Sequence, residues 1–159
     1  MTTVEIFGLL KEKFGDAILE SKTEGVPSPY VAVAPHSVLN VALFLRDNEQ
    51  TRFDVLMCLS GMDYMAGKFG VVYHLDSMPL RHKLTLKVHL TAENLHVQSV
   101  ESVWKTADWH EREAFDMYGI VFDGHPDLRR ILMPDDWEGY PLRKDFKVPQ
   151  YYNGMKVPY

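Results

Sequence analysis

The sequence predicts an α+β domain in which helices pack on a mostly antiparallel sheet, followed by an extended tail rich in proline and aromatic residues. The periodicities run helix, strand, helix, then three strands, then helices, an order typical of α+β domains. The connections at 61–70 and 78–82 are short enough for antiparallel pairing. Five of the nine prolines lie in 126–159. We therefore expect an α+β domain at 1–124 and an extended docking segment at 125–159.

The first elements are a helix, a strand and a second helix. Thr2 and Glu5 form a capping-box pattern, and apolar residues at helical spacing predict a helix over 3–14, ending at Gly15. Residues 26–29, Val-Pro-Ser-Pro, predict a turn. Residues 30–34 then predict a strand, and a second helix is expected to begin near Ser37.

Three strands are expected next. Residues 53–60 are almost all apolar, which favours a central place in the sheet. Residues 70–78 predict a second strand. Residues 83–90 alternate between leucine or valine and polar side chains, the pattern of a half-buried strand.

Helices are expected at 99–105 and 108–118. Asp108 and Glu111 have capping-box spacing, and Gly119 is a natural helix end. Glu111 also falls within the apolar arc of the second helix, so a buried Glu111 would need a hydrogen-bond donor, whereas the simpler alternative is a capping role alone. Arg112 and Asp116 lie four residues apart and can pair on the opposite side.

Composition excludes several functional classes. The chain has 159 residues and a net charge of −5, which disfavours binding of nucleic acid. Cys58 is the only cysteine, so neither an internal disulfide nor a thiolate-ligated iron–sulfur cluster is expected. The longest apolar run, 41–45, is far shorter than a membrane-spanning helix requires.

No arrangement of residues predicts catalysis. His110-Glu111 begins a zinc-protease pattern, but the position of the second histidine is Ala114. Cys58 fits a core strand, and Ser60 lacks the glycine pattern of a nucleophile elbow. The scattered histidines have no metal-ligand spacing, so no metal site is expected.

The last third of the chain contains two pairs of adjacent basic residues, which lie among prolines and aromatic residues. Arg129-Arg130 and Arg143-Lys144 lie beside His-Pro, Met-Pro and Tyr-Pro steps. Arginine favours bidentate pairing in desolvated interfaces, and regularly spaced rings can anchor an extended segment in a groove. We interpret this part as a surface for another protein. The segment's aromatic residues are Trp137, Tyr140, Phe146, Tyr151, Tyr152 and Tyr159.

Two stretches of this region resemble a family signature. Residues 111–119, Glu-Arg-Glu-Ala-Phe-Asp-Met-Tyr-Gly, followed by 125–132, His-Pro-Asp-Leu-Arg-Arg-Ile-Leu, are similar to the thirty-kilodalton (C) subunit family of respiratory complex I, an NADH-quinone oxidoreductase. Residues 141–146, Pro-Leu-Arg-Lys-Asp-Phe, resemble the C-terminal motif of that family. One departure is Lys147, where many relatives have proline. The matching motif positions are Glu111, Arg112, Glu113, Asp116, His125, Pro126, Arg129, Arg130, Arg143, Lys144 and Asp145.

The resemblance implies a cofactor-free subunit in the peripheral arm of a proton-translocating NADH–quinone oxidoreductase. It implies packing against the D subunit, which helps form the quinone site, near the iron–sulfur B and I subunits, with FMN and the iron–sulfur clusters held by partner subunits. It places the chain on the cytoplasmic face of the bacterial inner membrane, attached through the complex. The alternative is the equivalent subunit of a hydrogenase or of a ferredoxin- or F420-dependent membrane complex. A free-standing metalloenzyme is the rival class.

Overall fold

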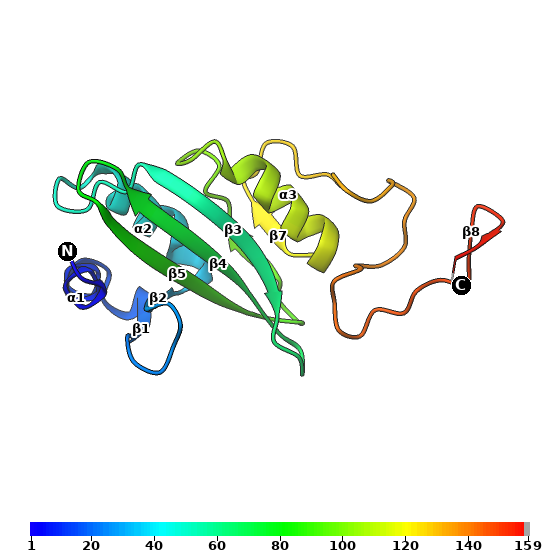
Figure 1. Cartoon of the computed structure of the whole chain (residues 1–159), viewed down its shortest axis with the longest axis horizontal. Helices are drawn as coiled ribbons and strands as arrows, with labels where there is room; N and C mark the ends of the chain where they lie inside the picture. Colours follow the sequence, from blue (N-terminus) through cyan, green and yellow to red (C-terminus); the bar gives the residue numbers. More distant parts are fainter. Residues whose placement is uncertain (158–159) are drawn as a thin grey trace.

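A computed structural model of the chain describes residues 1–157 and shows the predicted α+β architecture (Figure 1). Pro158 and Tyr159 lie outside the described residues. The elements in order are α1 (Thr3–Phe14), η1 (Gly15–Ala17), β1 (Ile18–Lys22), β2 (Tyr30–Val33), η2 (Pro35–Ser37), α2 (Val38–Asp47), β3 (Val55–Asp63), β4 (Lys68–Ser77), β5 (His82–Thr91), β6 (His96–Gln98), α3 (Ala107–Tyr118), β7 (Val121–Asp123), β8 (Tyr151–Tyr152) and β9 (Met155–Lys156).

The main sheet has five strands in the order β1-β2-β5-β4-β3. Its pairs are antiparallel except β2 with β5, which run parallel in the register Tyr30↔Thr85 to Ala32↔Lys87. A parallel pair needs a crossover, which the segment containing α2 begins. The sequence therefore predicted the mostly antiparallel sheet correctly but not the position of β2 within it.

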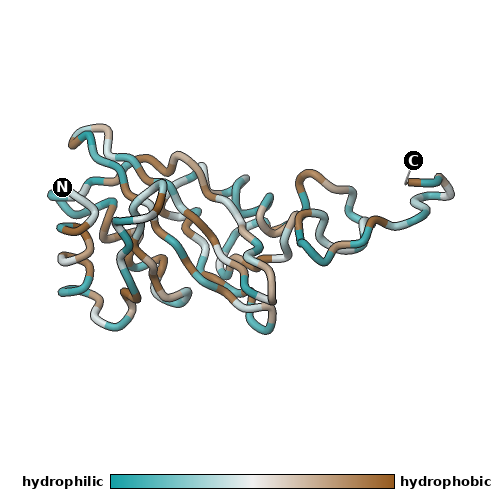
Figure 2. The backbone as a smooth tube through the Cα atoms, turned by 60° about the horizontal axis from the view of Figure 1, so that its bottom comes forward, coloured by the Kyte–Doolittle hydropathy of each residue, from teal (hydrophilic) through white to brown (hydrophobic). Residues whose placement is uncertain are grey.

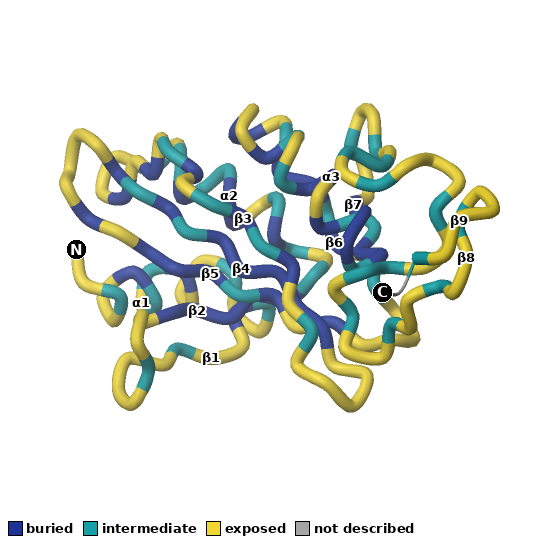
Figure 3. The backbone as a smooth tube through the Cα atoms, turned by 45° about the vertical axis from the view of Figure 1, so that its right-hand side comes forward, coloured by how far each residue is buried: buried dark blue, intermediate teal, exposed yellow. Residues whose placement is uncertain are grey.

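One face of the sheet carries the hydrophobic core. Leu84, Leu86 and Val88 of β5 pack into the same cluster as Ile6 of α1 and Val41 of α2. The burial-coloured trace shows the inner strands and the inner side of α3 as buried (Figure 3). Because strand side chains alternate, the residues between these leucines point to the opposite face of the sheet.

β3 is an edge strand, which corrects the expectation that its apolar run lies at the centre of the sheet. α3 packs along it and supplies the cover that a neighbouring strand would have given. Three side chains bond the backbone of 53–59: Trp104 Nε1 donates to Phe53 O at 2.9 Å, Thr106 Oγ1 to Leu56 O at 3.4 Å, and His110 Nδ1 accepts from Leu59 N at 3.0 Å.

The two capping predictions had different outcomes. Thr2 and Glu5 form the predicted capping box at the start of α1. At α3, however, the N-cap residue is Thr106 and no side chain caps it. The predicted end of α3 is confirmed, since Gly119 is left-handed with φ +74°.

Residues 99–105 are not a helix, contrary to the prediction. They form turns in which Val103 N and Trp104 N both donate to Val100 O. The buried carboxylate of Glu111 accepts from Val100 N at 2.8 Å, so a tertiary contact fixes the turn. The short parallel pair β6–β7, which flanks α3 in sequence, had no detectable pattern because each strand has only three residues.

The C-terminal segment extends beyond α3 (Figure 1). Residues 125–150 contain no helix or strand, and the hairpin β8–β9 follows. Hydrophobic and hydrophilic stretches alternate along the segment (Figure 2). Within residues 1–157, no helix is both long enough and apolar enough to cross a membrane.

Candidate docking site

Asp116 on α3 holds the start of the C-terminal segment. Its carboxylate is fully buried and accepts hydrogen bonds from the backbone N–H groups of Ile131, Leu132 and Met133 at 3.0, 2.7 and 2.9 Å. Burial alone would raise the pKa of Asp116, but these three donors and Arg130 outweigh it and hold that pKa below its ordinary value. Asp116 is therefore an ionised anchor, and we call the anchored residues 125–146 the strap.

Arg130 completes this anchor from the strap side. Its Nη1 lies 2.6 Å from Asp116 Oδ1, and its Nη2 donates to Trp137 O at 3.0 Å and Gly139 O at 3.1 Å. One guanidinium thus joins α3 to two later points of the strap. A planar fork with five donors is suited to this, because it can satisfy several carbonyls that no strand pairs.

Arg112 also bonds the strap, rather than Asp116 as the helical spacing predicted. The side chain is 8% exposed, and it donates to Arg129 O at 3.2 Å and Arg130 O at 3.1 Å. The four-residue pairing is wrong because each member found a partner on the strap, which sequence spacing cannot reveal.

Glu111 is a fully buried residue of α3, and its side chain does not cap the helix. Its carboxylate accepts from Ser99 Oγ at 2.6 Å as well as from Val100 N. Burial raises the pKa of Glu111 to about 7, although both hydrogen bonds oppose the shift. Burial, followed by the charge of Glu111, also raises the pKa of Tyr73, whose hydroxyl has no hydrogen-bond partner among residues 1–157. Glu111 therefore ties α3 to the preceding turn.

Arg143 makes the second attachment of the strap. Its Nε donates to Tyr118 O at 2.6 Å at the end of α3, and its guanidinium lies over the rings of Tyr140 and Phe69, 4.5 and 5.1 Å from their centroids. The strap passes so close to Gly119 that a Cβ there would lie 2.6 Å from Tyr140 Cζ. Glycine is thus required both by the backbone angle and by the space.

The strap also reaches the end of β3, and its start is fixed by His125. Lys144 N donates to Asp63 Oδ2 at 2.8 Å. At the other end, His125 Nδ1 accepts from Asp127 N at 3.0 Å, which places the proton on Nε2, and Nε2 donates to Asp108 O at 3.1 Å. His125, Arg130 and Arg143 of the strap therefore attach to α3 at Asp108, Asp116 and Tyr118, from its first turn to its last.

The remaining motif residues face outward. Glu113, Pro126, Arg129, Lys144 and Asp145 are exposed, and the Arg129 side chain pairs with its strap neighbour Asp127 at 2.8 Å. Exposed apolar side chains also occur on α3, on the strap and in the residues that follow the strap: Trp109 (67% exposed), Leu132 (62%), Leu142 (47%), Val148 (56%), Tyr151 (64%) and Met155 (66%). Large exposed apolar side chains are typical of an interaction surface, and those of the strap lie on a backbone that Asp116, Arg130 and Arg143 hold in place.

The described residues offer no metal-binding cluster of three or more His, Cys, Asp or Glu side chains. Two histidines of the sheet have separate partners: His82 Nε2 lies 2.6 Å from Thr51 O, and His74 Nδ1 lies 3.2 Å from Thr85 Oγ1.

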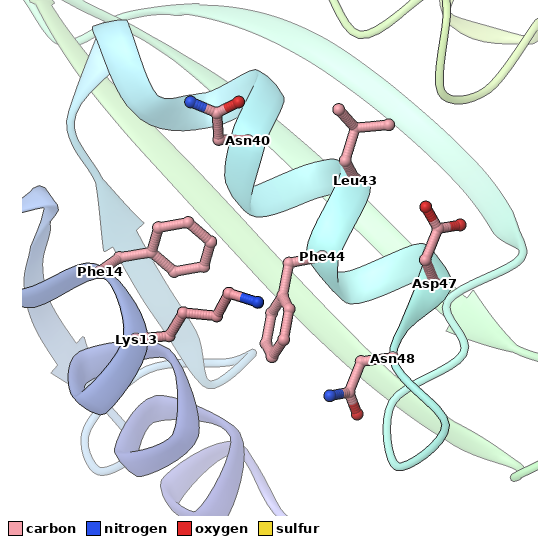
Figure 4. A pocket seen from close by; sticks show the side chains of 7 residues that line it. All are labelled: Lys13, Phe14, Asn40, Leu43, Phe44, Asp47 and Asn48. Atoms are coloured by element: carbon pink, nitrogen blue, oxygen red, sulfur yellow. The ribbon is translucent and has the colours of Figure 1, made fainter.

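A cleft of about 580 Å³ lies between α1 and α2, and its charged residues Lys13 and Asp47 contact other side chains of the protein (Figure 4). The Lys13 ammonium lies 4.0 Å above the Phe44 ring, and Asp47 pairs with Arg46 at 2.6 Å. Phe14 meets the edge of Phe44, with ring centroids 5.6 Å apart. We therefore interpret this cleft as part of the packing between α1 and α2.

Sequence reasoning missed Ser99 and Asp63, which bond motif residues from outside the motif. Ser99 lies 12 positions from Glu111, and Asp63 lies 81 positions from Lys144. Neither has a local pattern that marks it, so only the fold could identify them.

Comparison with known proteins gives a consistent result. The sequence model of the respiratory-chain NADH dehydrogenase 30 kDa subunit family matches residues 31–152. The C subunit of NADH-quinone oxidoreductase from Chloroherpeton thalassium is 51% identical over 154 residues, covering 96% of this chain and 64% of the relative. The corresponding protein of Chlorobium phaeobacteroides is 45% identical over 155 residues, covering 96% of this chain and 93% of that relative. The chain thus spans just under two thirds of the first relative and nearly all of the second.

Solved structures share the fold. A trypsin-resistant fragment (1–134) of Nqo5 superposes with a TM-score of 0.65 at 25% identity, covering 80% of this chain and all of the fragment. A chain of the membrane-bound sulfane sulfur reductase, an archaeal respiratory membrane complex, gives a TM-score of 0.70 at 24% identity, covering 91% of this chain and 85% of that one. At that identity the second likeness concerns the fold alone.

Proposed function

The chain belongs to the family of the 30 kDa subunit of respiratory-chain NADH dehydrogenase, and on that premise we propose that it is a cofactor-free scaffold subunit of a proton-translocating NADH–quinone oxidoreductase. In this role it sits in the peripheral arm, on the cytoplasmic face of the bacterial inner membrane, and is attached through its partners. NADH oxidation at FMN, electron transfer through iron–sulfur clusters and quinone reduction all occur in neighbouring subunits. The scaffold itself supplies no reacting group.

The observation that carries this proposal is the strap. Its backbone is fixed from behind by the buried groups Asp116 and Arg112 and by Arg130 and Arg143, while Leu132 and other apolar side chains point outward. A surface ordered before binding loses little conformational entropy on association. Buried apolar anchors of this kind dominate the energetics of interfaces. The outward face of the strap is therefore the proposed contact with the quinone-site (D) subunit, and the neighbouring surface faces the iron–sulfur B and I subunits.

The motif residues divide into two roles under this proposal. Asp116, Arg130 and Arg143 hold the strap in place within the chain. Arg129, whose side chain is 67% exposed, is available to a partner. The arginine pairs predicted from the sequence as interface residues thus include both intramolecular anchors and contact residues.

An assembly experiment tests the scaffold role. We expect Leu142→Asp, on the strap, to lower co-purification of the quinone-site subunit from native membranes and to leave the thermal stability of the free chain unchanged. Loss of one buried apolar anchor costs about 1–2 kcal/mol or more, and a buried carboxylate adds to this. Leu19→Asp is the matched control, because Leu19 is 54% exposed on β1, outside the strap. Normal assembly and quinone reduction with Leu142→Asp would contradict the proposal.

The alternative is the equivalent subunit of a related hydrogenase, ferredoxin- or F420-dependent membrane complex. The relatives at 45–51% identity are C subunits of NADH-quinone oxidoreductases, which supports the first assignment. The same purification distinguishes the two, since a flavin-bearing NADH module is expected among the partners only in the first case.

A further inference from the structure

A small cavity lies where the strap passes the end of β3 and the turn that follows it. It has a volume of about 260 Å³, and its lining includes residues 143–145 of the strap and residues 65–67 of the turn. Asp63 and Phe69 line it as well, and because they are paired across β3 and β4 their side chains point to the same face of the sheet, the face that carries the core. The strap therefore forms part of the cavity itself.

Arg143 is fixed in the cavity lining but uses only part of its guanidinium. Its Nε donates to Tyr118 O, and the guanidinium lies over the rings of Phe69 and Tyr140. Aromatic faces attract a cation without neutralising it. Within residues 1–157, Arg143 forms no salt bridge, and the bond from Nε is the only hydrogen bond of its side chain. The N–H groups of Nη1 and Nη2 are therefore available to a ligand.

The two acidic residues that line the cavity do not pair with Arg143. Asp63 has a backbone donor on each oxygen, since Oδ1 accepts from Met65 N at 2.7 Å and Oδ2 accepts from Lys144 N at 2.8 Å. Asp145 is exposed, and it forms no salt bridge with any other described residue. The cavity thus contains a guanidinium that is held in place and has no counter-charge within the described chain.

The turn that lines the cavity has an uncommon backbone conformation. Met65, Ala66 and Gly67 have φ angles of +70°, +51° and +72°. Left-handed backbone at residues other than glycine is unfavourable, and it persists where surrounding contacts impose it. Here Met65 N donates to Asp63, and Gly67 O accepts from Ala92 N at 2.8 Å. Because the same Asp63 carboxylate also accepts from the strap, one side chain holds the turn and the strap together.

We propose that Arg143 receives, in this cavity, an aspartate or glutamate side chain of the subunit that docks on the strap. The carboxylate pairs with the Nη groups, and Lys144 adds a second positive charge. A guanidinium presents its donors in a plane that matches a carboxylate, and the contacts that already fix Arg143 reduce the entropy lost on binding. Arg143 then ties the strap to α3 through Nε and the partner to the strap through its Nη groups. The inference rests on the proposed function, because it requires a second subunit on the strap.

Two variants that add a carboxylate to the cavity test the proposal in the assembled complex. Lys144→Glu adds it from the strap, and Ala92→Glu adds it from outside the strap, after β5. Each should lower the amount of the neighbouring subunit that co-purifies from native membranes by about tenfold or more, because the new carboxylate pairs with Arg143 and repels the incoming one. The matched control is Lys147→Glu, since Lys147 is exposed and does not line the cavity. An equal fall with Lys147→Glu would overturn the proposal.

Hydrogen exchange shows whether the strap stays attached in these variants. Lys144 bonds Asp63 through its backbone N–H, so the strap amides should keep their protection when only the side chain changes. Loss of that protection together with the neighbouring subunit would overturn the proposal, because detachment of the strap would then explain the loss.

Cross-linking with a carbodiimide, which joins an amine to a carboxylate in contact with it, identifies the occupant. In native membranes we expect a link from Lys144 to an aspartate or glutamate of another subunit, detected by mass spectrometry. The proposal is overturned if Lys144 forms no link, or links only to Asp63 or Asp145 of its own chain or to a second copy of this chain. Sedimentation of the chain with phosphatidylglycerol vesicles that both Lys144→Glu and Ala92→Glu abolish would also overturn it, because the bound anion would then be a lipid phosphate.

The two proposals fail separately, because Leu142 does not line the cavity. If Lys144→Glu and Ala92→Glu assemble normally while Leu142→Asp impairs assembly, only the carboxylate site is lost. If Leu142→Asp assembles normally while the two carboxylate variants do not, the apolar contact of the strap is the proposal that fails.

Discussion

Replacing Asp116 by asparagine should release the strap from α3 while the sheet stays folded. The carboxylate accepts three backbone hydrogen bonds and pairs with Arg130 at 2.6 Å, and its side chain is fully buried. Asparagine keeps the size but loses the charge, and its amide nitrogen cannot accept. Breaking one partner of a buried ion pair costs about 3–5 kcal/mol. Because about 1.4 kcal/mol is tenfold, the strap should open about two to four orders of magnitude more often.

Hydrogen exchange measures this opening directly. The amides of Ile131, Leu132 and Met133 donate to Asp116, so they should lose most of their protection in the variant. Amides of the β4–β5 pair should keep theirs. Asp127→Asn is the control, since Asp127 also pairs with an arginine of the strap but is exposed, and surface pairs contribute little. Unchanged protection of the three strap amides in Asp116→Asn would refute the anchoring role.

Two further predictions concern Glu111 and Gly119. Because the folded-state pKa of Glu111 is raised to about 7, the native state holds this proton more tightly than the unfolded chain. The free energy of unfolding should therefore fall by about 3 kcal/mol as the pH rises from about 4.5 to about 7. In Glu111→Gln this contribution should vanish in denaturant titrations across that range, and an unaltered pH profile would show that the carboxyl is not protonated as inferred. Gly119→Ala should lower both the melting temperature and the hydrogen-exchange protection of the strap amides. The reason is that φ at this position is +74° and the new Cβ would meet Tyr140, at a cost of about 1–3 kcal/mol. A fall in melting temperature without loss of strap protection would contradict the close approach of the strap to Gly119.

Local patterns predicted the parts of the fold that local interactions determine. The capping box of Thr2 and Glu5 fixes the start of α1, and the alternation of 83–90 fixes which side of β5 faces the core. The placement of β3 at the edge could not be predicted in this way. Its apolar run has the same composition whether another strand or α3 lies beside it, and Met57, 49% exposed, shows that one side stays partly open.

The candidate site was predicted as a set of residues but not as a set of contacts. Glu111 was correctly placed within the apolar arc of α3, and Gly119 at its end. The partners of Asp116 and Arg112 were wrong, because helical spacing favours a pair within α3 while the strap supplies better donors and acceptors. Such contacts depend on how a chain without regular structure returns to a helix, and no periodicity encodes that path.

The side chains that cover the edge at β3 are synthesised after the sheet itself. Strands β3, β4 and β5 are complete by Thr91, but the groups that close the β3 edge come later, from Trp104, Thr106 and His110. Until residue 110 has left the ribosome, an edge strand of nine residues with apolar side chains is open to pairing with another chain. Chains truncated before α3 should therefore aggregate, whereas chains truncated after Asp123 retain a covered edge and lose only the strap and the residues that follow it.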